Sequence, residues 1–122
     1  MKPDSVYLAH ILECIRKVRE DVAAGREAFF KSHLIQDAVL RNLQVMAEST
    51  QRLSAECKHR RPDIDWRRIG EFRNVLVHDY LGVDLEIVWR VISDDMGTLE
   101  EAVHQLSETP PPTGSLPRLP IP

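Results

Sequence analysis

The chain has 122 residues and a formal net charge of −3, and its composition is 43% hydrophobic and 29% charged. This length suits a single domain that buries roughly two thirds of its unfolded surface, and the composition is that of a globular rather than a disordered protein. The negative charge argues against indiscriminate binding to nucleic acid. No apolar run approaches the ~20 residues of a membrane span, and the N-terminus lacks the pattern of a signal peptide. We therefore expect a cytoplasmic protein.

The first half of the sequence predicts two long helices. The first begins near Asp4, and its apolar residues recur at steps of three and four as far as Gly25, which supplies a stop. A short turn is expected over residues 27–31. A second helix should then begin at Ser32 and run to about His59, before a proline breaks it.

The second half predicts three further helices. Asp65 is placed to cap a third helix that runs from Trp66 to Gly82. Asp84 can cap a fourth helix, and the Ser-Asp-Asp cluster at 93–95 can start a shorter fifth one. No segment alternates with period two for long enough to be a strand. The predicted fold class is therefore all-α, an antiparallel four- to five-helix bundle joined by short turns.

The composition changes sharply near the C-terminus and predicts two parts of the chain. Residues 1–108 carry the bundle, whereas six of the fourteen residues over 109–122 are Pro. Such a segment favours extended polyproline conformations, so we expect a solvated tail that projects from the bundle. The alternative is a docking peptide that inserts Leu116, Leu119 and Ile121 into a partner.

The cysteines and histidines do not form a metal-binding pattern. Cys14 and Cys57 have no CxxC spacing and no partner His at zinc-finger spacing, so we interpret both as small buried hydrophobes. His10 and Cys14 are four apart on a predicted helix, but no further ligand is spaced to complete a site. The sequence therefore predicts no metal and no cofactor.

A candidate site for binding and cutting a phosphodiester lies at the end of the predicted third helix. Its residues are Arg73, Asn74 and His78. The guanidinium can grip a phosphodiester with two hydrogen bonds, and an imidazole takes and gives protons near neutral pH. We assign a metal-independent mechanism in which His78 takes the proton from an RNA 2′-OH or protonates the leaving oxygen, while Arg73 neutralises the developing charge. Asn74 would orient the imidazole or the phosphate. As a bare pattern, an Arg and a His at a helix end are more often a surface pair or a helix cap.

The spacing of the two catalytic candidates has a geometric consequence. Five positions separate Arg73 from His78 by about 140° around a helix axis and ~7.5 Å along it, so they do not share one face. They can converge on one phosphate if the helix end unwinds near Gly82. They can also converge if a second copy of the chain presents the same patch across a groove, and a two-fold dimer makes such a groove automatically.

A basic segment precedes these residues. Residues 57–73 carry six Lys or Arg against three Asp or Glu, which gives +3 locally. Arg67 and Arg68 are the candidates for RNA binding, because a local basic patch can attract a polyanion that the whole molecule would not. The alternative is a solvated helix face.

At these residues the chain resembles the HepT-like proteins, which are HEPN-domain toxins of two-gene toxin-antitoxin modules. The RX4HXY signature of that family is matched by Arg73, His78 and Tyr80, with four residues between the first two and one residue between the last two. The resemblance covers roughly residues 4–107 and extends to these segments: 34–39, 41–43, 66–69, 73–80, 82–84 and 88–89. The sequence departs from the family where a Gly-Glu-Ala step is usual, since Ala47 precedes Glu48 here, and a close helix contact there can differ.

The resemblance implies a specific activity and specific partners. It implies a homodimer in which Arg73 and His78 of both subunits line a cleft where RNA is cut without metal. It also implies a nucleotidyltransferase antitoxin of the MNT type, which can transfer AMP from ATP to the motif tyrosine, here Tyr80. A bulky anion beside the Arg and His would block the groove and compete for the guanidinium.

Two classes of function are open at this point. The first is an endoribonuclease, the toxin of a type II-like toxin-antitoxin module, which is neutralised by AMPylation. The second is a noncatalytic nucleotide- or partner-binding subunit of a nucleotidyltransferase complex. The low overall charge favours the second class, and the intact motif favours the first, which we adopt.

Overall fold

The computed structural model describes residues 2–108, and the regular elements in that range are all helical. They are α1 (Asp4–Asp21), α2 (Arg26–Lys31), α3 (His33–Gln51), α4 (Ala55–His59), α5 (Trp66–His78), the 3₁₀ turn η1 (Tyr80–Gly82), α6 (Leu85–Arg90), the π-helical segment η2 (Val91–Asp95) and α7 (Met96–Glu108). The predicted all-α class is confirmed. The predicted tail over 109–122 lies outside the described residues. Among residues 2–108, no helix combines the length and apolarity needed to cross a membrane.

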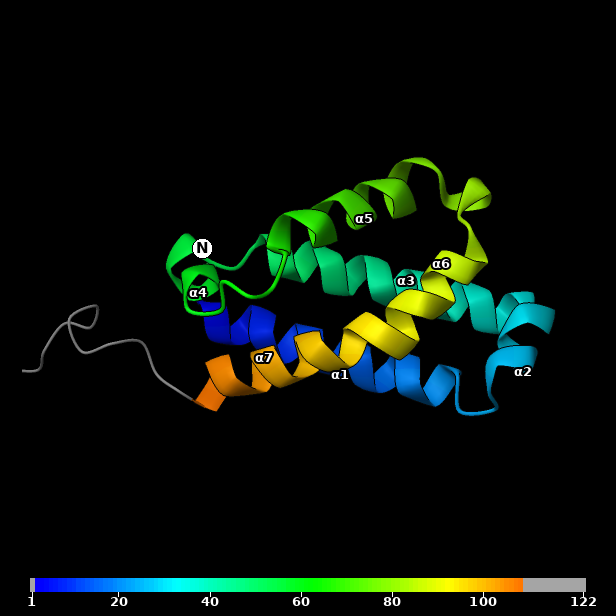
Figure 1. Cartoon of the computed structure of the whole chain (residues 1–122), viewed down its shortest axis with the longest axis horizontal. Helices are drawn as coiled ribbons and strands as arrows, with labels where there is room; N and C mark the ends of the chain where they lie inside the picture. The colour runs from blue at the N-terminus through cyan, green and yellow to red at the C-terminus, as the bar shows by residue number, and fades with distance from the viewer. Residues whose placement is uncertain (1, 109–122) are drawn as a thin grey trace, which may run out of the picture.

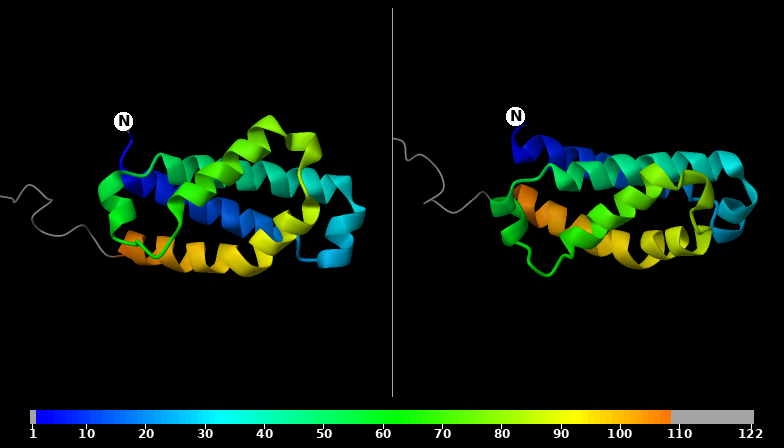
Figure 2. Two further views of the ribbon diagram at one scale, coloured as in Figure 1. Left: turned by 45° about the horizontal axis from the view of Figure 1, so that its top comes forward. Right: turned by 90° about the horizontal axis from the view of Figure 1, so that it is seen from above.

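The long helices run antiparallel to their neighbours along one axis (Figure 1). Helix α1 packs against α3 on one side and α7 on the other, and α5 lies on the outer side of α3. The segment from α5 through η1 to α6 turns at the same end of the bundle as α2, as both views in Figure 2 show. An ion pair between Arg26 and Glu86 joins α2 to α6 at that end.

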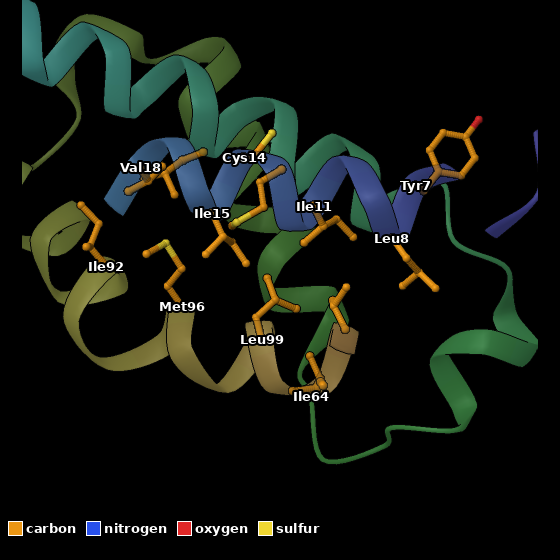
Figure 3. Close-up of a cluster of buried hydrophobic side chains, with 14 of the residues drawn as sticks. Tyr7, Leu8, Ile11, Cys14, Ile15, Val18, Ile64, Ile92, Met96 and Leu99 are labelled. Carbon is orange, nitrogen blue, oxygen red and sulfur yellow. The ribbon is translucent and has the colours of Figure 1, made fainter. Parts of the chain in front are cut away.

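The core forms where α1 meets α3 and α7. Ile11, Ile15 and Val18 of α1 are fully buried, and Figure 3 shows this row facing Met96 and Leu99 of α7. Burying one such aliphatic side chain contributes roughly 1.5–3 kcal/mol relative to leaving it exposed. The predicted apolar stripe of the first helix is therefore the inner face of α1.

The second predicted helix is interrupted, so the expectation of one helix as far as His59 was wrong. Helix α3 ends at Gln51, and Ser54 caps the separate α4 by accepting a hydrogen bond from the Cys57 amide at 3.1 Å. The carboxylate of Asp4 accepts hydrogen bonds from the Ser54 amide and hydroxyl at 2.8 and 2.7 Å. These polar contacts tie the break to the start of α1, and a continuous helix would lose them.

Two other predicted boundaries also differ. The segment expected to be a turn at 27–31 belongs to helix α2, which follows Gly25 in a positive-φ conformation of 99°. The Ser-Asp-Asp cluster at 93–95 does not start a separate helix, because α6, η2 and α7 form one continuous helical run. The Ser93 hydroxyl donates to the Trp89 carbonyl within this run, so it does not act as a cap.

Helix α5 begins as predicted and ends one turn early. Asp65 accepts a hydrogen bond from the Arg68 amide at 3.1 Å, which confirms its role as the cap. The helix stops at His78 rather than Gly82, because Asp79 leaves helical geometry at φ −138° and ψ 46°. A Cβ atom on Gly82 would lie 2.5 Å from the Asp79 carboxylate, so a larger residue at this position would displace the Asp79 side chain.

We predict that Leu43→Ala lowers the free energy of unfolding by about 2–5 kcal/mol, because the Leu43 side chain is fully buried and its truncation leaves a cavity. Leu34→Ala is the matched control on the same helix, since Leu34 is 72% exposed, and it should change stability by less than about 0.5 kcal/mol. Urea denaturation followed by circular dichroism measures both variants. Equal losses in the two variants would contradict the assignment of the inner face of α3.

Candidate functional site

The predicted site residues lie on the last two turns of α5 and on η1. Few residues of α5 are buried, chiefly Leu76 and Gly70, so most of this helix stays near the surface. Its contacts with the bundle are made mainly to α3. The polar side chains of α3 that meet α5 therefore decide how the site residues are held.

Arg73 points toward α3. Its guanidinium donates to the Asn74 side-chain oxygen at 3.2 Å and to the Glu48 carboxylate at 3.4 Å. The second distance is long for a charge-assisted hydrogen bond, which is usually 2.7–2.9 Å, and the Nε–H of Arg73 is buried without an acceptor. Arg73 thus reaches the bundle interior with donor capacity that Glu48 and Asn74 do not use.

His78 is on a different side of the helix from Arg73. It is exposed, whereas Arg73 is half-buried against α3, in agreement with the angular separation that the spacing predicts. Asn74 is exposed and contacts the guanidinium of Arg73. Unwinding near Gly82 was one of two ways in which the pair could converge. The helix does end before Gly82, but only after His78, and this does not bring the imidazole to the guanidinium.

Tyr80 contacts the opposite end of α3. Its hydroxyl donates to the Asp37 carboxylate at 3.1 Å, while the residue remains 36% exposed. The pKa of the Tyr80 phenol is raised above its ordinary value, first by partial desolvation and then by the hydrogen bond and charge of Asp37. The neutral phenol is thus the favoured form, and it stays accessible from solvent.

A row of polar contacts, which we call the polar seam, joins α3 to α5 and η1. It runs in antiparallel register through Gln51, Glu48 and Asp37 of α3. Gly70 lies against the side chain of Gln51, whose amide nitrogen would be 2.6 Å from a Cβ at that glycine. Arg73 then meets Glu48, and Tyr80 meets Asp37. Glu48 and Asp37 are eleven positions apart, so these two contacts are separated by about 16 Å of helix and by only ~20° around it.

The sequence did not single out Asp37, and it singled out Glu48 only as part of the family resemblance. The seam itself leaves a signal in the sequence. Asp37, Gln44, Glu48 and Gln51 are spaced by seven, four and three positions, which places these four polar residues along one stripe of the helix.

The basic patch is smaller than the local charge suggests. Arg67 has a 90% exposed side chain and only a long contact of 3.5 Å with Glu71, and Arg68 is also exposed. Arg61 is held between Asp63 and Glu101 with its side chain 15% exposed. Arg67 and Arg68 are therefore exposed to solvent, which both RNA binding and a solvated helix face require, whereas Arg61 is already neutralised.

An apolar groove of about 300 Å³ lies between α5 and the continuous α6–η2–α7 helix, away from the predicted site. Most of its lining side chains are apolar, and its polar lining residues are Arg68, Thr98 and three carboxylates, Asp63, Asp65 and Asp95. Arg73, Asn74, His78 and Tyr80 are not among its lining residues. The chemistry-bearing side chains thus lie on the α3 side and the outer face of α5 rather than in this groove.

Both cysteines are buried free thiols, as predicted. Burial raises the pKa of the Cys14 thiol and of the Cys57 thiol, so neither is a ready thiolate. Within residues 2–108, His, Cys, Asp and Glu side chains form no group of three that could hold a metal ion.

The fold and the site together define a helical bundle with an Arg-x4-His-x-Tyr segment at the end of one surface helix. A family model described as "Ribonuclease HepT-like" matches residues 11–106. The chain belongs to this HepT-like ribonuclease family.

Three relatives agree with this assignment. A protein of Methanocaldococcus jannaschii named "Gamma-glutamylcyclotransferase and putative RNase" is 34% identical over 108 residues, which are 88% of this chain and 49% of the relative. This chain therefore spans about half of that protein. A "Putative RNase" of Caldanaerobacter subterraneus subsp. tengcongensis is 30% identical over 107 residues, covering 87% of this chain and 96% of the relative. A "Probable ribonuclease HepT" of Thermococcus cleftensis is 31% identical over 104 residues, covering 82% and 92% respectively. No solved structure matches the chain significantly.

We predict that Tyr80 ionises above its ordinary pKa of 10.0, because burial and Asp37 both favour the neutral phenol. In the variant Tyr7→Phe, which leaves Tyr80 as the single tyrosine, the phenolate absorbance reports this titration directly. Adding Asp37→Asn should lower the pKa, because the negative charge is lost while the partial burial remains. The stabilisation linked to the raised pKa is present below pH 10 and is lost as the pH rises through the folded-state value. A Tyr80 titration at or below pH 10 would contradict the geometry of this contact.

Proposed function

We propose that this chain is a metal-independent endoribonuclease that uses Arg73 and His78. The observation that carries the proposal is their arrangement on α5, where Arg73 holds a buried N–H without an acceptor and His78 is an exposed imidazole. A phosphodiester supplies acceptors for the guanidinium, and the exposed imidazole can reach a ribose hydroxyl. Membership of a ribonuclease family gives this assignment priority over a cap or a surface pair.

The proposed reaction is a transesterification within the RNA backbone. His78 accepts the proton of the ribose 2′-OH as its oxygen attacks the adjacent phosphorus, and the bond from phosphorus to the 5′-oxygen breaks. The products are a 2′,3′-cyclic phosphate and a 5′-hydroxyl that receives a proton. Arg73 stabilises the negative charge that develops on the phosphorus oxygens. Asn74, which already contacts the guanidinium, orients Arg73 or the phosphate.

A homodimer would solve the problem that one protomer directs Arg73 and His78 to different sides of α5. Val75 and Val77 flank the site on the exposed surface of α5 and are 46% and 36% exposed. Exposed apolar side chains beside functional residues suit an interface between subunits. In a two-fold arrangement the same patch from both protomers would line one groove, and Arg67 and Arg68 would extend a positive surface for the RNA backbone.

We further propose that the chain is the toxin of a toxin-antitoxin module in the cytoplasm, and that its partner is an MNT-type nucleotidyltransferase antitoxin. The proposed switch is AMPylation of Tyr80, whose hydroxyl is accessible two positions after His78. The added phosphate and nucleoside would place negative charge and bulk beside the imidazole and repel the RNA backbone. The 16 Å between the two α3 contacts implies that the adduct covers the His78 end of the site first.

The alternative is a noncatalytic subunit that only binds a nucleotide or the nucleotidyltransferase. The pairing of Arg73 with Glu48 favours it, because a guanidinium engaged by a carboxylate is less available to a phosphate. The two functions differ in whether the purified protein cuts RNA.

We predict that Arg73→Ala and His78→Ala each reduce RNA cleavage by about 10²–10⁴-fold, because each removes one of the two groups that stabilise the transition state. Cleavage of a labelled RNA in the presence of a chelator measures the loss, and mass analysis of the fragments identifies the 2′,3′-cyclic ends. Arg16→Ala and His104→Ala are matched controls, since both residues are exposed and lie on α1 and α7. Wild-type cleavage by both site variants would refute the catalytic assignment.

Sedimentation equilibrium of the wild type tests the dimer, and a monomer at the assay concentration would refute the shared groove.

We predict that the protein gains one or more adenylate units when it is incubated with ATP and the nucleotidyltransferase encoded beside it. Tyr80→Phe should abolish the gain, because the acceptor oxygen is removed, while Tyr7→Phe should retain it. Tyr7 is a suitable control because it is a buried tyrosine of the core. Intact-mass spectrometry measures the gain, and modification of Tyr80→Phe would place the acceptor elsewhere.

A further inference from the structure

The Tyr80 hydroxyl has a charged partner within the same chain, although that partner is 43 positions away. The acceptor is the Asp37 carboxylate on α3, at 3.1 Å from the phenol oxygen. We infer that Asp37 is the general base for nucleotidylation of Tyr80, so that the acceptor protein carries part of the machinery for its own modification. This inference rests on the proposed modification of Tyr80.

A base is needed because the phenol is a poor nucleophile at neutral pH. A tyrosine with an ordinary pKa of ~10 is ionised in only about one molecule in a thousand at pH 7. Partial desolvation and the neighbouring carboxylate reduce that fraction further here. A carboxylate that already accepts the hydrogen bond of the attacking hydroxyl meets the requirement, and protein kinases use an Asp in this way toward the substrate hydroxyl.

The proposed step is a nucleotidyl transfer to the phenol oxygen. The Tyr80 oxygen forms a bond to the α-phosphorus of a nucleoside triphosphate, and the bond from that phosphorus to the bridging oxygen breaks. Pyrophosphate leaves with the bond electrons, and the phenol proton passes to Asp37 and then to solvent. The transferase would supply the nucleotide and its metal, while Asp37 and the turn of η1 would supply the oriented hydroxyl.

The surroundings of the contact favour Asp37 for this role. Tyr80 lies in a short turn that is closed by a hydrogen bond from the Gly82 amide to the Asp79 carbonyl at 3.1 Å. His33 and Arg41 lie one turn to either side of Asp37 on α3, and His78 and Asp79 precede Tyr80 in the chain. Among these titratable and charged groups, Asp37 is the one that contacts the phenol oxygen.

The product of the step would be incompatible with the starting contact. Once the phenol oxygen is esterified it has no proton to donate, and the new phosphodiester brings a negative charge toward the Asp37 carboxylate. Like charges at such a distance repel, so the modified side chain would leave α3. The base would thus promote the forward reaction and then expel its product.

The test compares rates of modification of the wild type and Asp37→Asn by the neighbouring nucleotidyltransferase and ATP, measured by intact mass between pH 7 and 9. The amide keeps an oxygen that can accept the phenol hydrogen bond but it cannot act as a base. We expect Asp37→Asn to be slower by about 10²-fold at pH 7. Its rate relative to the wild type should rise toward tenfold per pH unit, because it depends on free phenolate. Taking the ratio at each pH cancels the pH dependence of the transferase.

Two further variants separate the base from a structural role. Asp37→Glu restores a carboxylate and should recover at least tenfold of the lost rate, and Asp94→Asn, on an exposed part of η2, should match the wild type. A rate for Asp37→Asn within twofold of the wild type would overturn the inference, and so would a slower rate whose ratio to the wild type is constant across pH, because Asp37 would then have at most a positioning role. Absence of any mass gain in the wild type would instead refute the modification itself.

Discussion

The structure depends on helix α3, which has to satisfy two different neighbours at once. Its apolar face is buried against α1, and this burial supplies the core that holds the bundle together. A polar stripe beside that face contacts α5 and η1 through Gln51, Glu48 and Asp37. Hydrophobic burial is strong but not directional, whereas hydrogen bonds and ion pairs fix geometry at a modest net gain in stability. The bundle is therefore stabilised by one side of α3, and the site is positioned by the other.

This division bears on the proposed functional residues, which lie on α5 and η1. A helix held by few buried apolar side chains and several polar contacts belongs to the less stable part of a fold, where ligand-binding segments are usually found. Under the proposed function, Arg73 would exchange its loose contact with Glu48 for a phosphate more easily than it would exchange a tight, buried pair. Tyr80 is held at the other end by a single hydrogen bond, which a covalent change removes. The two ends of the site can therefore respond to different ligands.

Much of the fold could be predicted from the sequence, because periodic apolar residues and caps are local signals. The inner face of α1 and the cap at Asp65 are examples. The break after Gln51 was missed because its cause is a distant carboxylate, Asp4. The motif singled out the proposed site residues on α5, and their angular separation followed from helix geometry. Their partners Glu48 and Asp37 depend on how α5 lies across α3, and that is a tertiary property.

The π-helical segment between α6 and α7 has a consequence for how this helix can vary in length. Through this segment, α6 and α7 form one continuous helical rod. The rod packs Trp89 against Phe29, with the two ring centroids 5.4 Å apart, and further along it packs Met96 against α1. Removing a residue from it would rotate one half of the rod by about 100° relative to the other. One of the two apolar faces would then turn away from its neighbour. Insertions and deletions are consequently better tolerated outside this rod than within it.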